Sequence, residues 1–184
     1  MAPDDAAPDE AAAGDPSVDG PAVTPVETRH GVPVTHSRGQ VVLHPDRGGY
    51  LELVTELRRS GYWMCVDLCG VDYLGHTGDR NLPAGVRPER FEVVTNHLNH
   101  SDRSRVRVRV QVPEQDPTVA SLFAVHPGVQ NAERETFDLF GIRFDGHPDL
   151  TRILLPDDWE GHPLRKDDAM GRIPVQFKGA PSAR

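Results

Sequence analysis

The segment after Gly141 combines many prolines with many large apolar residues, and this combination restricts its fold. The prolines are Pro148, Pro156, Pro163, Pro174 and Pro181, and the apolar residues are Leu150, Ile153, Leu154, Leu155, Trp159, Leu164, Ile173, Val175 and Phe177. Each proline removes a backbone hydrogen-bond donor and disfavours helix at the residue before it. Such an extended segment cannot form its own core. It must lie across the rest of the chain or across another protein, and we favour another protein.

The residues just before this segment predict a helix. Residues 131–140 place Ala132, Thr136, Leu139 and Phe140 on one side, and Gly141 marks the end. Beyond it, we expect residues 142–144 and 150–155 to pair as a small hairpin. We assign residues 131–184 as a helix followed by an extended, partner-wrapping segment, and call residues 142–184 the strap.

Residues 105–112 show the clearest periodic pattern. Four valines alternate there with three arginines and a glutamine. A period of two gives a strand one apolar face and one basic face. The apolar face must be buried, and the basic face must meet solvent or a partner. The short polar link at residues 98–104 predicts a hairpin with the strand at residues 90–98.

The remaining elements come in mixed order. The patterns predict strands at residues 40–43 and 62–73, a helix at 47–59, a loop at 75–88, and a second helix from Pro117 that presents Val119, Leu122 and Phe123 to the sheet. Strands and helices in this order indicate an α+β fold. We expect a two-layer domain over residues 36–130, with a mixed, largely antiparallel sheet and packed helices.

Residues 1–35 form an acidic leader rich in alanine and proline. They hold seven acids against Arg29, and so carry −6 of the chain's net charge of −8. This composition offers too little apolar surface to offset the entropy lost on ordering, so we expect the leader to be disordered. It lacks the basic start and apolar stretch of an export signal, and the chain has no run of about 18 apolar residues. We expect a soluble, cytosolic chain that contacts a membrane only through partners.

The chain has two cysteines, Cys65 and Cys69. Four residues apart on one strand, they lie on one face about 13 Å apart, too far for a disulfide. Two thiols also fall short of the four ligands that an iron–sulfur cluster usually needs. We interpret both as reduced, partly buried thiols.

Two histidines of the strap have acidic neighbours. His147 lies between Asp145 and Asp149, and His162 follows Glu160. Zinc sites favour close ligand pairs such as two histidines one helical turn apart, whereas both histidines here precede prolines in irregular structure. We interpret them as turn residues that hydrogen-bond to the backbone. A free-standing metal-dependent hydrolase that uses these two histidines is the remote alternative.

The other chemistry-bearing residues favour neither catalysis nor nucleic-acid binding. Glu133 and Asp138 belong to an acidic group, but no nucleophile motif or phosphate-binding glycine loop accompanies it. Arg105, Arg107 and Arg109 form a basic stripe, but no aromatic residues interleave with it. The chain is acidic overall, so a solvated or protein-facing surface is the better interpretation of the stripe.

Four segments resemble one protein family. They are residues 133–142, 144–150, 152–156 and 158–166, which read ERETFDLFGI, FDGHPDL, RILLP and DWEGHPLRK. They closely resemble the C subunit of NADH-quinone oxidoreductase, which belongs to the hydrophilic arm of respiratory complex I. The resemblance is looser over residues 40–130 and absent from the leader. Two positions depart from the family pattern: Asn131 stands where the family usually has tryptophan, and Asp168 where it usually has tyrosine.

The resemblance implies a non-catalytic structural subunit of a proton-translocating NADH:quinone oxidoreductase, an electron-transport complex of the respiratory chain. It implies that flavin, iron–sulfur clusters and quinone are bound by partner subunits and not by this chain. The protein would clamp the D subunit, which holds the quinone site, beside iron–sulfur subunits, and support electron transfer from NADH to quinone. It would lie peripherally on the cytoplasmic face of the cell membrane and bind no nucleic acid.

The partner interface is assigned to ten residues that match the family's segments. They are Glu133, Arg134, Glu135, Asp138, Phe140, His147, Arg152, Trp159, Arg165 and Lys166. Arginines and aromatic residues are the expected anchors of such an interface. The alternative is the equivalent subunit of a related membrane-bound complex that takes electrons from ferredoxin, a deazaflavin or hydrogen.

Overall fold

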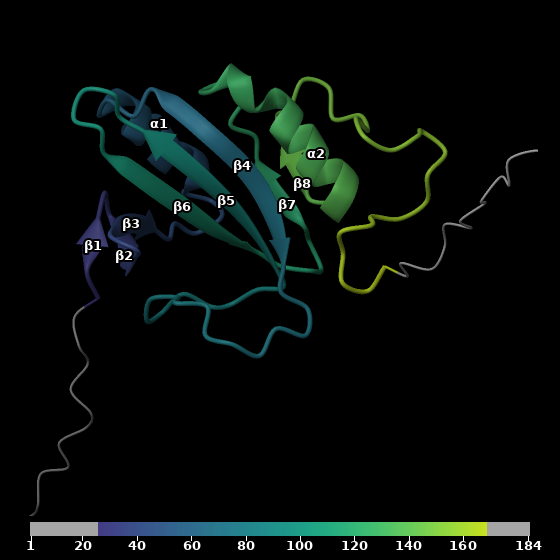
Figure 1. Cartoon of the computed structure of the whole chain (residues 1–184), viewed down its shortest axis with the longest axis horizontal. Coiled ribbons are helices and arrows are strands. Elements are labelled where there is room, and N and C mark those ends of the chain that lie inside the picture. Colours follow the sequence, from purple (N-terminus) through teal and green to yellow (C-terminus); the bar gives the residue numbers. More distant parts are fainter. Residues whose placement is uncertain (1–25, 169–184) are drawn as a thin grey trace, which may run out of the picture.

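A computed structural model describes residues 26–168, with a six-stranded sheet at its centre (Figure 1). In spatial order the strands are β1 (Thr28–Arg29), β2 (Val32–Ser37), β3 (Gln40–Leu43), β6 (Arg105–Val112), β5 (Phe91–Leu98) and β4 (Met64–Asp72). Neighbouring strands are antiparallel except β3 and β6, which run parallel. The sheet is therefore mixed and largely antiparallel. Together with the helices it makes the predicted α+β fold.

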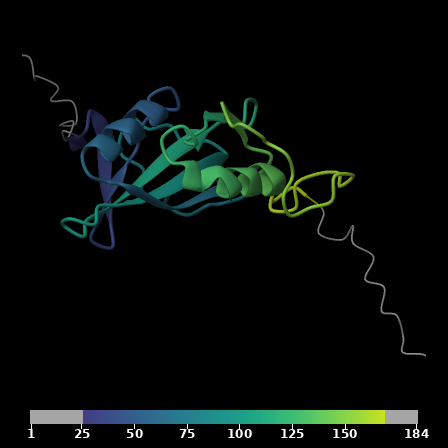
Figure 2. The same ribbon diagram turned by 90° about the horizontal axis from the view of Figure 1, so that it is seen from above.

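Two α-helices, one single-turn helix and a small second sheet complete the architecture of the described residues. They are α1 (Tyr50–Arg59), the single-turn helix η1 (Pro127–Val129), α2 (Gln130–Phe140), and the parallel pair β7 (Thr118–Ala120) and β8 (Arg143–Asp145). Figures 1 and 2 both place the described part of the strap, up to residue 168, at the α2 end of the molecule, away from β1. Within residues 26–168, no helix combines the length and apolar character needed to cross a membrane.

The hydrophobic core lies between α1 and one face of the sheet. α1 buries four residues at helical spacing, Tyr50, Leu53, Val54 and Leu57. The four valines of β6 are at most 2% exposed and pack into the same core. Each fully buried apolar side chain stabilises the fold by about 1.5–3 kcal/mol. The predicted helix and the apolar face of residues 105–112 are both confirmed.

The opposite face of β5 and β6 carries a buried ion-pair network. Glu92 is fully buried and accepts hydrogen bonds from Arg109 Nε (2.7 Å) and Nη2 (2.9 Å), and from Arg80 Nη2 (3.2 Å). Arg80 comes from the loop between β4 and β5, and its guanidinium lies 3.6 Å from the centre of the Tyr73 ring. The basic face of residues 105–112 was expected to meet solvent or a partner. At Arg109 this expectation is wrong, because the chain's own loop covers the guanidinium.

Two predicted elements are wrong. The segment after Pro117 forms strand β7 and not a helix, and β8 pairs with β7 in parallel, so no hairpin joins it to residues 150–155. The Arg143 N–H donates to the Pro117 carbonyl (2.8 Å), and Val119 and Phe144 are both buried. Pairing two distant segments gives both of them sheet hydrogen bonds and core contacts, and this overrides the local helical pattern.

The predicted boundary of the disordered leader is also wrong. β1 and the first residues of β2 fall within residues 1–35, and they pair with each other in the sheet. The Val34 N–H donates to the Glu27 carbonyl at 2.9 Å, which fixes the chain as far back as that residue. Residues 1–25 of the predicted leader lie outside the described residues.

The two cysteines lie on opposite faces of β4 and not on one face as predicted. The register of β4 against β5 shifts between Cys65 and Asp67. A one-residue shift reverses the faces of the residues after it. Cys65 therefore lies opposite buried His97, whereas Cys69 lies opposite half-buried Val94. Burial raises the pKa of the Cys65 thiol to about 12, which keeps it protonated.

β4 and α2 approach each other closely at Gly70. A Cβ atom at Gly70 would lie 2.9 Å from Cγ2 of Thr136 and 3.0 Å from Cδ2 of Phe140. We predict that Gly70→Ala lowers the free energy of unfolding by about 1–3 kcal/mol, the usual cost of overpacking a core. Urea unfolding followed by circular dichroism measures this change.

Gly128→Ala is the matched control. A Cβ atom at Gly128 meets nothing within 4 Å. Its free energy of unfolding should stay within about 0.5 kcal/mol of the original value. Equal losses in the two variants would contradict the close contact between β4 and α2.

Candidate functional site

The side chain of Asp138, near the end of α2, organises the strap. It is fully buried, and its Oδ2 accepts the backbone N–H groups of three successive residues, Ile153 (3.0 Å), Leu154 (2.8 Å) and Leu155 (3.0 Å). Its Oδ1 accepts a hydrogen bond from Arg152 Nη1 at 2.6 Å. One carboxylate thus satisfies a backbone turn that belongs to no helix or strand.

This arrangement points the backbone of residues 153–155 toward Asp138 and leaves three large apolar side chains of the strap exposed. Ile153 is 37% exposed, Leu154 is 59% exposed and Leu164 is 48% exposed. Arg152 fixes the turn further, because its Nη2 donates to the Gly161 carbonyl at 3.2 Å. The strap is therefore anchored on its own domain through polar groups, while large apolar side chains face outward.

The hydrogen bonds to Asp138 also set its charge state. Burial by itself raises the pKa of a carboxyl group. Here the three backbone N–H groups and the Arg152 guanidinium outweigh burial and lower the pKa of Asp138 to about 2. The carboxylate is therefore ionised at neutral pH, as its role as a multiple acceptor requires.

A second anchor joins the far end of the described strap to the sheet. Arg90, the residue just before β5, donates to Asp72 (Nη2 to Oδ2, 2.9 Å) and to Asp167 (Nη2 to Oδ1, 2.6 Å). The Lys166 backbone N–H also donates to Asp72 Oδ2 at 2.8 Å. None of Asp72, Arg90 and Asp167 was predicted as a site residue. No local pattern marks them, since Arg90 and Asp167 are 77 positions apart.

Glu133 anchors a different loop. It is fully buried, and it accepts hydrogen bonds from the Ser121 hydroxyl (2.6 Å) and the Leu122 N–H (2.7 Å). Burial raises the pKa of Glu133, although both hydrogen bonds act against this shift. The residue holds the connection after β7 against α2, which is a structural role inside the domain.

The two strap histidines bond to backbone oxygens, as predicted. His147 Nε2 lies 3.1 Å from the Gln130 carbonyl, and its Nδ1 accepts the Asp149 N–H at 3.1 Å. Nδ1 of His147 thus acts as an acceptor, and Nε2 faces a carbonyl to which it can donate. His162 Nδ1 lies 2.9 Å from the Asp138 carbonyl. Within residues 26–168, no three histidine, cysteine or acidic side chains gather closely enough to hold a metal ion.

The other predicted interface residues divide between anchoring and exposure. Arg134 donates to the Thr151 and Arg152 carbonyls, and Phe140 packs over Gly70. The Arg165 guanidinium lies 5.0 Å from the centre of the Phe91 ring. Trp159 is half-buried, and the side chains of Glu135 and Lys166 are exposed. Asp168, one of the two departures from the family pattern, accepts the His162 N–H at 2.9 Å and closes the turn there. Arg134, Asp138, His147 and Arg152 thus hold the strap to α2. Glu133 and Phe140 support other parts of the domain.

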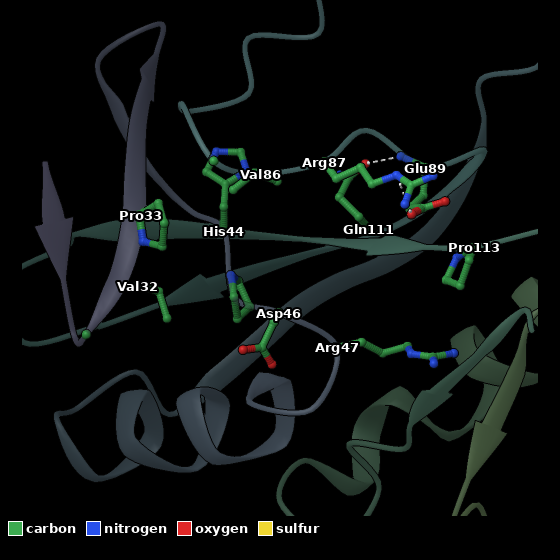
Figure 3. A pocket seen from close by; sticks show the side chains of 13 residues that line it. Val32, Pro33, His44, Asp46, Arg47, Val86, Arg87, Glu89, Gln111 and Pro113 are labelled. Carbon is green, nitrogen blue, oxygen red and sulfur yellow. Dashed lines mark hydrogen bonds and ion pairs between the residues drawn. The ribbon is translucent and has the colours of Figure 1, made fainter. Parts of the chain in front are cut away.

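A cavity of about 450 Å³ opens elsewhere, beyond the ends of β3 and β6 (Figure 3). His44 and Gln111 reach it from the sheet, and Val86 and Glu89 reach it from the long loop. Burial and the nearby Arg109 lower the pKa of His44 to about 4, so this histidine is neutral. None of the ten predicted residues lines this cavity. The candidate site is therefore the anchored strap with its exposed apolar side chains.

The family comparison agrees with the sequence segments that define this site. The family described as "Respiratory-chain NADH dehydrogenase, 30 Kd subunit" matches residues 43–173. The C subunit of NADH-quinone oxidoreductase from Saccharopolyspora erythraea is 43% identical over 150 residues, which cover 80% of this chain and 56% of that protein. The protein of the same name from Roseiflexus castenholzii is 46% identical over 146 residues, which cover 76% of each chain. The chain thus spans about half the length of the first of these relatives.

Two solved structures share the fold. A trypsin-resistant fragment of Nqo5 is 35% identical with a TM-score of 0.57, over 65% of this chain and 90% of the fragment. A chain in the structure of the membrane-bound sulfane sulfur reductase, an archaeal respiratory membrane complex, has a TM-score of 0.64 at 16% identity. The match covers 83% of this chain and 90% of that chain. At this low identity, the second likeness concerns the fold alone.

Asp138 makes stability depend on pH. Its pKa of about 2 in the folded chain lies below the value of about 4 expected on unfolding, so its contribution is complete above about pH 4 and is lost as the pH falls toward 2. The full contribution is about 2–3 kcal/mol. We predict that Asp138→Asn lowers the free energy of unfolding at pH 7 by at least this amount and removes this part of the acid dependence.

The measurement is urea unfolding of both proteins at pH 6 and pH 3. The original chain should lose more stability between these values than Asp138→Asn. Glu135→Gln is the matched control, because Glu135 is an exposed carboxylate on the same helix and should change stability by about 0.5 kcal/mol or less. An acid dependence that is unchanged in Asp138→Asn would contradict the assigned role.

Proposed function

This chain belongs to the family of the 30 kDa subunit of respiratory-chain NADH dehydrogenase, and from that premise we propose that it is a structural subunit of a proton-translocating NADH:quinone oxidoreductase. In this role it binds the D subunit, which holds the quinone site, and performs no redox chemistry itself. Flavin, iron–sulfur clusters and quinone are held by partner subunits. The assembled complex holds this chain on the cytoplasmic face of the membrane.

The observation that carries this proposal is the exposed apolar surface of an anchored strap. Ile153, Leu154 and Leu164 are exposed although the backbone beside them is fixed by hydrogen bonds. Large apolar side chains exposed on an ordered surface segment are typical of a protein–protein contact. A partner that covers them gains their burial, about 1.5–3 kcal/mol for each large side chain.

The anchors make this surface suitable for clamping. A strap that is already ordered loses little conformational entropy when a partner covers it, so more of the contact energy appears as affinity. Asp138 and Arg90 supply this order, because each fixes one part of the strap to the domain. In a redox complex this kind of protein acts by positioning its neighbours, since electron transfer depends on fixed distances between centres.

A second candidate is the equivalent subunit of a related membrane-bound complex with another electron donor. The observation in its favour is the shared fold with a chain of the archaeal sulfane sulfur reductase complex. The two candidates assign the same clamping role to the strap. They differ in the partner protein that binds the electron donor.

The test is purification of the tagged chain from its native host in mild detergent, with mass spectrometry of the proteins that accompany it. We expect a quinone-site protein similar to the D subunit, together with iron–sulfur and flavin proteins. The identity of the flavin protein distinguishes the two candidates. A chain that emerges alone with stoichiometric zinc would refute the structural role and support the hydrolase alternative.

Leu154→Glu tests the strap in the same experiment. Placing a charge in a buried contact should reduce the recovery of the quinone-site partner about tenfold or more. Val66→Glu is the matched control, because Val66 on β4 is 47% exposed and lies outside the strap. Equal recovery of the partner with Leu154→Glu and with the unchanged chain would remove the strap from the interface.

A further inference from the structure

Two features of the sequence have no part in the proposed function. Residues 1–25 contain six acids and no lysine, arginine or histidine. Arg105 belongs to the basic stripe of β6 but lies at its far end from the Glu92 network, which binds Arg109. A local excess of negative charge and a local excess of positive charge thus occur in one chain.

The structure brings Arg105 into a basic cavity. A cavity of about 410 Å³ lies where β1, the turn between β2 and β3, and the β5–β6 connection meet. Three arginines line it: Arg29 comes from β1, and Arg103 and Arg105 come from the end of the β5–β6 connection and the start of β6. Gly39 and Gln40 also line it.

The positive charge of this cavity is largely uncompensated within residues 26–168. None of the three arginines forms an ion pair with another described residue, unlike Arg90 and Arg109. The acidic residue in the wall is Asp102. Its carboxylate is already engaged, since Oδ1 accepts the Ser104 N–H (2.9 Å) and the Ser104 hydroxyl (2.7 Å).

The positive charge of Arg29 acts on Asp102, which lies on the β5–β6 connection at the other side of the cavity. The pKa of Asp102 is lowered chiefly by its hydrogen bonds from Ser104, and Arg29 adds to this shift. Three guanidinium groups against one engaged carboxylate leave a cavity that attracts anions. Arginine suits this task, because its planar group of donors matches the two oxygens of a carboxylate or the oxygens of a phosphate.

We propose that this cavity is an anion-binding site and that carboxylates of the chain's own acidic leader occupy it, with Asp15 and Asp19 as the ligands. Residues 1–25 of the leader end where the described chain begins, at residue 26, three positions before Arg29. From Asp19 to Arg29 the chain has ten residues, which span about 18 Å as a flexible coil and about 33 Å when fully extended. Both acids are therefore within reach.

The covalent connection favours the leader over free anions. A segment tethered by a short linker is present at an effective concentration in the millimolar range. Shorter loops also cost less entropy to close, which favours Asp15 and Asp19 over acids nearer residue 1. Contacts between exposed charges are weak one by one, but the tether keeps several of them available together. Occupancy by the leader should weaken with salt, because the charges lie at the surface.

The test uses inorganic phosphate as a competing probe on the full-length chain. Binding is followed by the NMR signals of the arginine Nε–H groups at low ionic strength. We expect Asp15→Asn with Asp19→Asn to bind phosphate at least threefold more tightly than the original chain, because the internal competitor is removed. Equal phosphate affinity in the two proteins would overturn the assignment of the leader as occupant.

Two controls distinguish the site and the ligands from general charge effects. Arg29→Gln, Arg103→Gln and Arg105→Gln together should abolish phosphate binding in the Asn-substituted leader, whereas Arg143→Gln, an exposed arginine on β8, should leave it unchanged. Phosphate binding that survives the triple substitution would exclude the cavity.

Asp4→Asn with Asp5→Asn makes the same charge change at a greater distance and should have the smaller effect. An equal effect would overturn the choice of Asp15 and Asp19.

This experiment is independent of the proposed function. It measures a contact within one chain and needs no partner protein. Circular dichroism of every variant should match that of the original chain, since all substituted residues of the described part are exposed.

Discussion

A buried carboxylate must find enough hydrogen-bond donors to replace the water it loses, and this fold uses that requirement repeatedly to fasten its irregular segments. Glu92 accepts a hydrogen bond from Arg80 of the long loop, and Glu133 accepts one from the connection after β7. Asp138 accepts the backbone N–H groups of the turn at residues 153–155. Each of the three acids lies on a regular element, and each holds at least one donor from a segment without regular structure. The sheet and α2 thereby determine the course of the chain well beyond themselves.

The turn at residues 153–155 of the strap is fastened through its backbone, and this leaves apolar side chains there exposed. Its N–H groups face Asp138, so the side chains of Ile153 and Leu154 remain on the outside. An apolar segment that folded onto its own domain by side-chain burial would leave nothing for a partner. Here, hydrogen bonds to charged groups order the strap instead, so its exposed apolar side chains remain available to a partner. The proposed role as a clamp rests on this separation.

Sequence patterns predicted the elements whose burial has a simple period. The valines of β6, the four buried residues of α1 and the helix that ends at Gly141 were all readable in this way. The pattern failed where a partner distant in sequence decides the conformation. β7 and β8 exist because they pair with each other, and the shift between Cys65 and Asp67 comes from the match to β5. Neither contact leaves a local signal.

The sequence by itself determined the fold class, the family and the position of the apolar strap, since these depend on periodicity, on proline and on motifs within short segments. The tertiary structure alone decided which charged residues meet. It joined Arg90 to Asp167, buried Glu133 inside the domain, and gathered three arginines around one cavity. The physical reason is that electrostatic and hydrogen-bond contacts depend on distance in space, and the fold brings together residues that are far apart along the chain.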